Sequence, residues 1–328
     1  MGTGLDTTFG CALEEAYGTY KAPSRFLEID STSLARKGDY LAPRPLRGRP
    51  GIPSARHKQT TRQAEGNVQM EVPNTQFGQV LNLLHGEAVT PEKQGAEAAY
   101  KQVHPIGVTP PNGKSLTVQI NKPAVDADHA FTYLGTKITQ ATFSCDTSGA
   151  LKCALDLMAQ DVDMSKELKE ATYAAVIESF DFTQPTVKIG GEAIDADLLI
   201  HSFSLSIPIP LKSQRYGLGH GATQLEPHGF NDSMLPTWEL AAEFSNLDLY
   251  NFYIADEPKA IEISFVGKTI VGAHKDTITF LAPAGKFTGS DPEVGGPDVL
   301  DQTASLEVYD TITSPLVTIT TMSADAAL

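Results

Sequence analysis

The stretch Gly66-Asn67-Val68-Gln69-Met70-Glu71-Val72 decides the fold class, because apolar and polar side chains alternate along it with a period of two. Such alternation is typical of a β-strand with one buried and one accessible face. The same pattern recurs elsewhere, bounded by Gly, Pro, Asn and Asp. These further stretches are residues 116–120, 138–144, 203–207, 262–266 and 316–320. The chain is therefore predicted to be mainly β.

Two short helices are expected between the strands. The first covers residues 76–85, where Asn74 or Thr75 is available as N-cap and Gly86 as the stop. The second covers residues 247–255. Each helix directly follows a predicted strand, so the order of elements in the first half of the chain resembles the order in the second half.

This repeated order predicts an internal duplication of one β unit. The first copy has strand 26–34, long loop 35–65, strand 66–72, helix, strand 116–120 and hairpin 138–159. The second copy has strand 199–207, long loop 208–236, strand 237–244, helix, strand 261–266 and hairpin 304–321. The predicted organisation is an N-terminal arm (1–22), a first unit (23–163), a connection (164–192), a second unit (193–322) and a C-terminal tail (323–328). The apolar spacing of the connection fits either a short helix or an extended linker.

Composition narrows the class of protein. Lys and Arg total 25 against 40 Asp and Glu, a net charge of -15, which argues against a protein that grips nucleic acid through its phosphates. Cys11, Cys145 and Cys153 are too few for a disulfide framework and are expected to be small core residues of a protein folded in a reducing cytoplasm. The N-terminus has no secretory signal pattern, and no stretch approaches the roughly 20 apolar residues that span a bilayer.

The most unusual segment is a basic strip in the first long loop, which also holds Pro43, Pro45, Pro50 and Pro53. Its basic residues are Arg36, Lys37, Arg44, Arg47, Arg49, Arg56, Lys58 and Arg62, and Asp39 is the one acidic residue among them. A loop of this length in a compact domain is usually functional or disordered. We expect an arm that docks on an acidic surface of a neighbouring subunit; a solvated loop is the alternative. Nucleic-acid binding is a third reading, with Tyr40 as the sole aromatic residue for stacking.

The sequence contains no recognisable catalytic or metal-binding motif. The eight histidines are scattered without metal-ligand spacing, and no nucleophile elbow or His-Glu-x-x-His pattern is present. We therefore expect no enzyme activity, no cofactor and no metal.

Three groups of residues carry a resemblance to a known family. They are the opening with Thr7-Thr8-Phe9-Gly10, Glu14-Glu15-Ala16-Tyr17-Gly18-Thr19 and Pro23-Ser24-Arg25-Phe26-Leu27-Glu28 leading to Ser31-Thr32-Ser33-Leu34, the strand and helix from Gly66 to Gly86, and Phe131-Thr132-Tyr133-Leu134-Gly135-Thr136-Lys137-Ile138 running into Phe143. In this order they resemble the tail tube proteins of long-tailed, non-contractile bacteriophages. The resemblance covers the first half of the chain, and the second half joins it through the predicted duplication.

The resemblance implies a β-sandwich or barrel with a flanking helix, in subunits that stack as rings into a hollow tube for phage DNA. It implies contacts with further copies of the chain and with tail terminator, tape measure and distal tail proteins, in a virion assembled from protein made in the host cytoplasm. The basic strip, Tyr216 and His220 are then the expected inter-ring or inter-subunit contacts. The inner wall is expected to be net negative, so that DNA slides without specific binding.

Alternatives remain for the number of chains in a ring and for the functional class of the protein. Two copies of the fold in one chain predict a ring of three chains with approximate six-fold symmetry, whereas a ring of six is the alternative. A β-sandwich that acts as a surface-binding or adhesin module is the alternative function. That module would expose an aromatic platform, which the 8% aromatic content disfavours.

Overall fold

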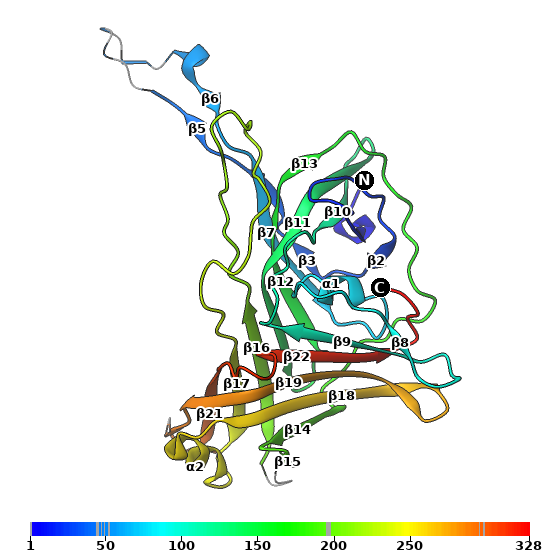
Figure 1. Ribbon diagram of the computed structural model, residues 1–328, viewed down its shortest axis with the longest axis vertical. Coiled ribbons are helices and arrows are strands. Elements are labelled where there is room, and N and C mark those ends of the chain that lie inside the picture. Colours follow the sequence, from blue (N-terminus) through cyan, green and yellow to red (C-terminus); the bar gives the residue numbers. More distant parts are fainter. Residues whose placement is uncertain are drawn as a thin grey trace.

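The computed structural model describes residues 2–43, 46, 48, 50–51, 53–194, 198–294, 296–297 and 299–328. Arg44, Arg47 and Arg49 of the basic strip lie outside the described residues. Figure 1 shows a body of packed sheets, with the hairpin of β5 and β6 projecting from one end of it. The mainly β prediction is confirmed.

Strands run through the whole described chain. They are β1 (Phe9–Leu13), β2 (Arg25–Leu27), β3 (Ser31–Thr32), β4 (Ala35–Lys37), β5 (Tyr40–Leu41), β6 (Lys58–Gln59), β7 (Gln63–Glu71), β8 (Glu92–Lys93), β9 (Tyr100–Ile106), β10 (Leu116–Pro123), β11 (Asp128–Asp146), β12 (Lys152–Ala159), β13 (Asp161–Asp163), β14 (Pro185–Ile189), β15 (Glu192–Ala193), β16 (Ile200–Pro208), β17 (Thr237–Glu243), β18 (Lys259–Val271), β19 (His274–Gly289), β20 (Pro292–Glu293), β21 (Asp301–Val308) and β22 (Val317–Ser323). The helices are η1 (Gly4–Asp6), η2 (Ser54–Arg56), α1 (Gly78–Leu81) and α2 (Asp248–Ala255).

One antiparallel run of strands forms the wall of the body. Its order is β3 with β4, then β7, β12, β11, β16, β17, β21 and the end of β19. Side chains alternate along these strands. On β16, for example, the serine side chains are accessible, whereas Phe203, Leu205 and Ile207 are buried. One face of the run is therefore buried, and the run remains open rather than closing into a barrel.

A second layer covers the buried face. It contains the first halves of β11 and β19, because β11 also pairs with β10 and β13, and β19 also pairs with β18 and β22. The rings of Phe143 and Phe280 lie 4.9 Å apart between the layers, and those of Phe203 and Phe265 lie 5.7 Å apart. Buried apolar side chains from both layers form one hydrophobic cluster.

The strand pairings occur in two matching series. The first series is β3 with β4, β7, β12, β11 and β10, with β13 on the first half of β11. The second series is β16, β17, β21, β19 and β18, with β22 on the first half of β19. The pairing of β11 with β16 joins the two series edge to edge.

Several local expectations were wrong. The first helix covers only Gly78–Leu81, and Phe77, rather than Asn74 or Thr75, is its N-cap residue. Gln76 has φ 65°, a left-handed conformation that interrupts a right-handed helix. The first long loop contains a β-hairpin, because Tyr40 pairs with Gln59.

The C-terminal hairpin expected at residues 304–321 does not form. Strand β21 pairs with β17, β19 and β20, whereas β22 pairs with β19 and β9. Residues 164–184 of the connection form neither helix nor named strand. The described part of the chain contains no helix with the length and apolar character needed to cross a membrane.

A buried histidine pair lies between the segment after α1 and strand β9. Nε2 of His85 lies 3.1 Å from Nδ1 of His104, and both side chains are fully buried. Burial, with the nearby Lys114 ammonium, lowers the pKa of His85 to about 4. Burial, then the neighbouring His85 and Lys114, lowers the pKa of His104 to about 3. Both imidazoles are therefore neutral in the folded protein at neutral pH.

We expect this pair to make folding acid-sensitive. Below the unfolded pKa of about 6.5, the unfolded chain binds protons that the folded chain refuses, so stability falls as pH drops from 6.5 towards 4. Each histidine contributes a slope of up to about 1.4 kcal/mol per pH unit in that window. The free energy of unfolding in urea, measured from pH 7 to 4, should fall less steeply in H85Q and H104Q than in the parent.

The exposed His228 supplies the control, because H228Q should keep the slope of the parent. The slope of each variant must be compared with that of the parent, because other groups also titrate in this range. Burial raises the pKa of Asp276 and Asp325, so their contribution to the free energy of unfolding rises as pH falls and opposes that of the histidines. Equal slopes in the parent and both variants would contradict the assignment.

Candidate functional site

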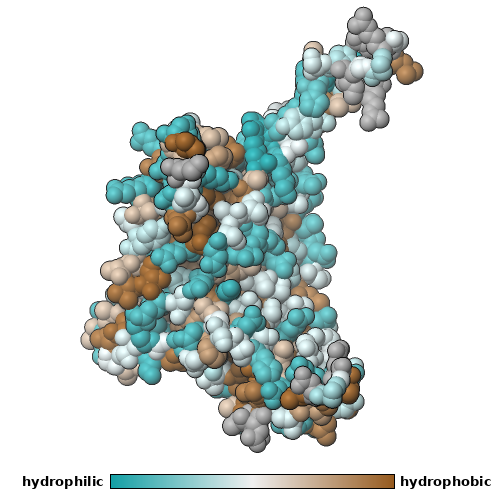
Figure 2. All heavy atoms as spheres, turned by 180° about the vertical axis from the view of Figure 1, so that it is seen from behind, coloured by the Kyte–Doolittle hydropathy of each residue, from teal (hydrophilic) through white to brown (hydrophobic). Residues whose placement is uncertain are grey.

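The described parts of the basic strip include a projecting hairpin of β5 and β6, and we call residues 36–62 the arm. Leu41 pairs with Lys58 across it, and the rings of Tyr40 and His57 stack with centroids 4.9 Å apart. Figure 2 shows the described atoms of the arm coloured mainly as hydrophilic and standing clear of the body. A hairpin without a hydrophobic core of its own gains little from folding alone, which is why such a segment is suited to contact with a partner.

Ion pairs within the chain hold the base of the arm. Nε of Arg36 lies 3.2 Å and Nη1 of Arg62 lies 3.5 Å from the two carboxylate oxygens of Asp161 on β13. Nζ of Lys37 lies 3.2 Å from the carboxylate of Glu65. These basic side chains stay accessible, so each pair is worth only about 0 to 1 kcal/mol. Part of the positive charge expected for a neighbouring subunit is thus already paired inside the chain.

The second long loop (residues 208–236) supports the arm from one side. The backbone N–H of Arg62 donates to the carbonyl of Ala222 at 2.8 Å, and the hydroxyl of Tyr216 donates to Oε1 of Gln63 at 3.1 Å. A groove of about 650 Å³ lies between the arm and this loop, lined by residues that include Tyr40 and Gln214. Burial raises the pKa of Tyr216 above its ordinary value, so its hydroxyl stays protonated.

The structure brings only some of the expected contact residues together. Arg36, Lys37, Arg62 and Tyr216 meet at the base of the arm. Arg56 and Lys58 lie further along it, and His220 lies on an exposed turn of the second loop. Arg44, Arg47 and Arg49 belong to the same strip in sequence but fall outside the described residues.

A buried charge pair fastens the second loop to the first series of strands; we call it the clasp (Lys137 and Glu226). Nζ of Lys137 lies 2.7 Å from Oε1 of Glu226 and also donates to the carbonyls of Pro111 at 2.9 Å and Pro227 at 3.2 Å. The Lys137 side chain is 2% exposed. Burial lowers the pKa of Lys137, and Glu226 opposes that shift.

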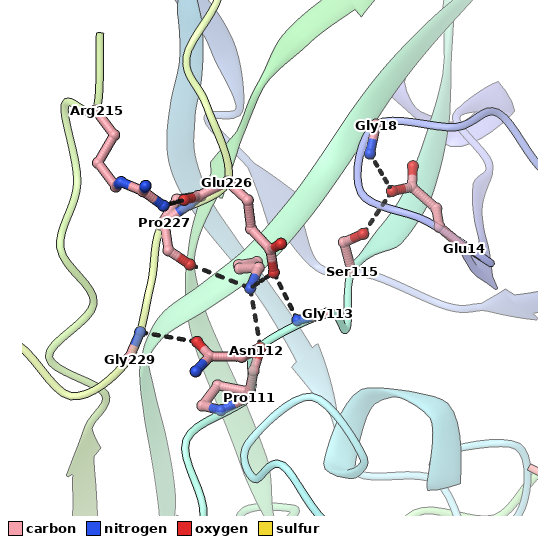
Figure 3. A network of polar contacts seen from close by, with 11 residues as sticks. Glu14, Gly18, Pro111, Asn112, Gly113, Ser115, Arg215, Glu226, Pro227 and Gly229 are labelled. Carbon is pink, nitrogen blue, oxygen red and sulfur yellow. Dashed lines mark hydrogen bonds and ion pairs between the residues drawn. The ribbon is translucent and has the colours of Figure 1, made fainter. Parts of the chain in front are cut away.

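Hydrogen bonds from backbone N–H groups complete the clasp. Figure 3 shows Glu226 and Pro227 extending from the second loop towards Pro111 and Gly113. The N–H of Gly113 donates to Oε1 of Glu226 at 2.6 Å, and the N–H of Gly229 donates to Oδ1 of Asn112 at 2.8 Å. The same loop therefore contacts both the arm and the body.

Glu14 is a second buried charge close to the clasp. Its carboxylate accepts hydrogen bonds from the N–H groups of Gly18 at 2.8 Å and Gly135 at 2.9 Å and from the hydroxyls of Ser115 and Thr117. No salt bridge to Glu14 is present in the described part of the chain. Several neutral donors can hold an ionised carboxylate in this way.

The accessible face of the strand run, which we call the polar face, has a distinctive composition. Its charged positions are Glu65, Glu71, Asp146, Asp156, Glu239, Glu243, Asp301 and Glu307 against Lys37, Lys152 and Lys286. The described strand positions of this face include no arginine and no Phe, Tyr or Trp, although Tyr309, just beyond β21, donates to Glu307, and the imidazole of His201 lies 3.5 Å from Glu243 at the margin of the face. Most of the others are Ser, Thr, Gln and Asn. A phosphate backbone meets net repulsion on such a surface, and bases find no stacking partner.

These features define a mainly β protein with an open sheet, with outer strands that have a free side among the described residues, and with a projecting arm. The described residues contain no group of three or more His, Cys, Asp or Glu side chains that could hold a metal ion. The chain belongs to the phage tail tube protein family, whose model matches residues 4–308 of the 328. It is a structural protein of the bacteriophage tail. No curated protein matches the chain.

The pattern of alternating residues gave no signal for the clasp, for Asp161 or for the environment of Glu14. Lys137 and Glu226 are far apart in sequence and meet only through tertiary folding. Asp161 lies on β13, well beyond the acid-poor strip that it neutralises. Long-range pairing of this kind leaves no local periodicity to detect.

We expect the clasp to depend on its charge match. E226Q leaves the Lys137 ammonium buried without its counter-ion, and loss of one partner of a buried ion pair costs on the order of 3 kcal/mol. The double variant K137M/E226L removes both charges and should recover part of that loss, because the N–H of Gly113 and the carbonyls of Pro111 and Pro227 lose their partners. Urea unfolding of the single and double variants measures both effects.

The exposed pair of Lys268 and Glu178, whose Nζ and Oε1 atoms lie 2.8 Å apart, is the matched control. E178Q should change the free energy of unfolding by less than about 1 kcal/mol. If E226Q lowers the free energy of unfolding no more than E178Q does, the clasp contributes no more to stability than an exposed ion pair.

Proposed function

We propose that this chain is a tail tube subunit that assembles into rings, and that the rings stack into a hollow tube through which phage DNA passes. Its role is structural rather than enzymatic. The observation that carries the proposal is the acidic polar face on a strand run whose outer segments, β3 with β4 and residues 286–289 of β19, have one free side among the described residues, in a chain of the tail tube family. A wall built from such sheets repels a polyanion on one side and continues sideways into neighbouring copies.

The polar face is proposed to line the lumen. Carboxylates outnumber lysines on it, and hydroxyl and amide side chains fill most of the remaining positions. DNA held by counter-ion release needs clusters of Lys and Arg, which this face lacks among its described positions. The lining therefore lets DNA move along the tube without a binding site that would stop it.

The two pairing series are proposed to be copies of one tail tube unit, within residues 23–163 and 193–322. Residues 1–22, 164–192 and 323–328 are then the N-terminal arm, the connection and the C-terminal tail. Matching strand orders and the edge-to-edge contact between β11 and β16 support this division. Three chains with two units each would form a ring with approximate six-fold symmetry, and a ring of six chains is the alternative.

The arm is proposed to bridge successive rings. It projects from one end of the body, and it concentrates basic residues in a chain with a net charge of -15. Arg36, Lys37 and Arg62 are paired at its base. Contacts with acidic side chains of the next ring are proposed for Arg44, Arg47, Arg49, Arg56 and Lys58, with Tyr216 and His220 of the second loop as further contacts.

The other proposed partners are the tail proteins that a tube of this family would contact. We propose contacts with tail terminator, tape measure and distal tail proteins in a long, non-contractile tail, and synthesis in the host cytoplasm before assembly into the virion. These partners rest on the family alone.

Electron microscopy of the purified chain tests the proposed assembly. We expect rings or tubes with three chains in each ring, because each chain supplies two units. Protein that stays monomeric at high concentration would contradict the tube proposal. End views with six chains per ring would contradict the proposed ring of three chains, but the proposal that the chain forms a tube would stand.

The arm is tested by replacing Arg44, Arg47, Arg49 and Arg56 together with serine. Each ion pair contributes only about 0 to 1 kcal/mol, but every subunit repeats the contact, so the variant should polymerise less than the parent at low salt. Added salt screens the ion pairs of the parent, and the difference should narrow. Sedimentation measures the tubes, and circular dichroism measures the fold.

A control variant changes the net charge equally outside the arm. Lys93, Lys169, Lys212 and Lys275 are exposed and take part in no salt bridge within the described residues, so their replacement by serine should leave polymerisation near that of the parent. Equal polymerisation of both variants and the parent at every salt concentration would make the arm a solvated loop.

A further inference from the structure

The turn at residues 110–113 contains a chemically labile pair, because Asn112 is followed by Gly113. It is the one Asn-Gly pair in the sequence. Gly113 has φ +73°, a left-handed conformation that glycine adopts without strain. No described atom lies within 4 Å of the place where a Cβ of Gly113 would be, so the backbone conformation, rather than the space, favours glycine here. The turn therefore favours the residue that makes the preceding asparagine reactive.

An asparagine in this context can react without an enzyme. The backbone nitrogen of Gly113 loses its proton to water and attacks Cγ of Asn112, and the side-chain nitrogen takes up a proton and leaves as ammonia. The product is a cyclic imide. Water then opens the imide at Cγ, which gives aspartate, or at the backbone carbonyl carbon, which gives isoaspartate. In sum, one side-chain amide and one water become one carboxylate and one ammonium ion.

Both reacting residues are accessible to water. Asn112 and Gly113 are exposed. Glycine has no Cβ beside the attacking nitrogen, so ring closure meets little steric hindrance at an Asn-Gly pair. Asn231 is also exposed, but it is followed by Asp232, whose side chain crowds the nitrogen. Asn112 is therefore the asparagine at which imide formation is expected first.

The second loop binds both of the groups that must react. The N–H of Gly113 donates to Oε1 of Glu226 at 2.6 Å, and Oδ1 of Asn112 accepts from the N–H of Gly229 at 2.8 Å. Figure 3 shows the Asn112 side chain directed towards Gly229, while the Gly113 nitrogen faces Glu226. Attack requires the reacting atoms to be in contact and in line. Both hydrogen bonds hold them in another arrangement and therefore oppose ring closure.

The charge of Glu226 adds to this restraint. The attacking nitrogen becomes negative as its proton leaves, and that charge would develop beside a carboxylate. The nitrogen would also give up a hydrogen bond to a charged acceptor, which is stronger than one between neutral groups. Nζ of Lys137 keeps the carboxylate in place, because it also donates to the carbonyls of Pro111 in the turn and Pro227 in the loop.

We propose that Asn112 is a site of spontaneous deamidation, and that the second loop suppresses the reaction for as long as the clasp is closed. The inference does not depend on the proposed assembly. Isoaspartate would add a methylene group to the backbone before Gly113 and move its N–H away from Glu226. Either product would also place a new negative charge near that carboxylate. Each reaction therefore opposes closure of the clasp in the chain where it has occurred.

Peptide mass spectrometry of the full-length parent chain tests the site. The chain is kept at mildly alkaline pH, either folded in buffer or unfolded in urea, and the conversion of each asparagine is followed with time. In urea Asn112 should convert faster than Asn231. In the folded chain its conversion should be slower by about tenfold or more, the factor that corresponds to one hydrogen bond to a charged group.

Two results of that comparison would overturn the proposal. If Asn112 converts no faster than Asn231 in urea, the Asn-Gly pair is not a preferred site. If Asn112 converts equally fast in the folded and the unfolded chain, the fold does not protect it.

The variant E226Q separates protection by the clasp from protection by folding in general. It removes the negative charge and should accelerate conversion of Asn112 in the folded chain by about tenfold. L240A is the matched control, because Leu240 is buried on β17 and its truncation lowers stability without touching the clasp. L240A should convert Asn112 at close to the rate of the parent. Equal acceleration in both variants would overturn the role of the clasp.

A urea series on the parent answers the same question if E226Q does not fold. Opening of the clasp alone exposes less surface than global unfolding, so the rate of conversion below the unfolding transition should rise only weakly with urea. A rate that rises with urea as steeply as the population of unfolded chain would overturn the role of the clasp.

Discussion

Strand β11 passes from one layer to the other, and this passage holds the two layers together. Its first half pairs with β10, and its second half pairs with β12 and β16, so the strand must change partners near Gly135. Gly135 has φ +62°, and a Cβ atom there would lie 2.8 Å from the ring of Tyr17. A glycine is therefore required both by the backbone and by the space.

Both buried charges are placed at this change of partners. The N–H of Gly135, which turns out of the regular strand pairing, donates to the Glu14 carboxylate, and the Lys137 ammonium begins the clasp two residues later. Backbone groups freed by a bend need partners when they are buried. The N-terminal segment and the second loop supply those partners, so two distant parts of the chain are held at the point where the sheet divides.

Local patterns predicted the fold better than the site. Alternation along residues 66–72 and 203–207 identified strands correctly, because one face of each strand is buried over its whole length. The helix at residues 76–85 was overestimated, because Gln76 adopts a left-handed conformation that composition does not reveal. The hairpin at 304–321 failed for another reason, since β22 finds its partners in β19 and β9 far away in sequence.

The basic strip shows the same limit for the site. Its charge was visible in the sequence, but its pairing with Asp161 was not, because that carboxylate arrives from a separate strand. The sequence therefore predicted a basic arm without showing that Arg36, Lys37 and Arg62 at its base are paired within the chain. The polar face could be read from the outward residues of each strand only after the registers were known.

The junction between β11 and β16 also has a kinetic meaning. Every association of separate molecules loses translational and rotational freedom, a cost of several kcal/mol that covalent connection avoids. In the proposed ring of three chains, the internal junction would make half of the contacts between units intramolecular, at a high effective concentration. Nucleation of that ring would need three molecules to meet, where six single-unit chains would otherwise be needed. The rate of nucleation would then fall off less steeply when the protein is diluted.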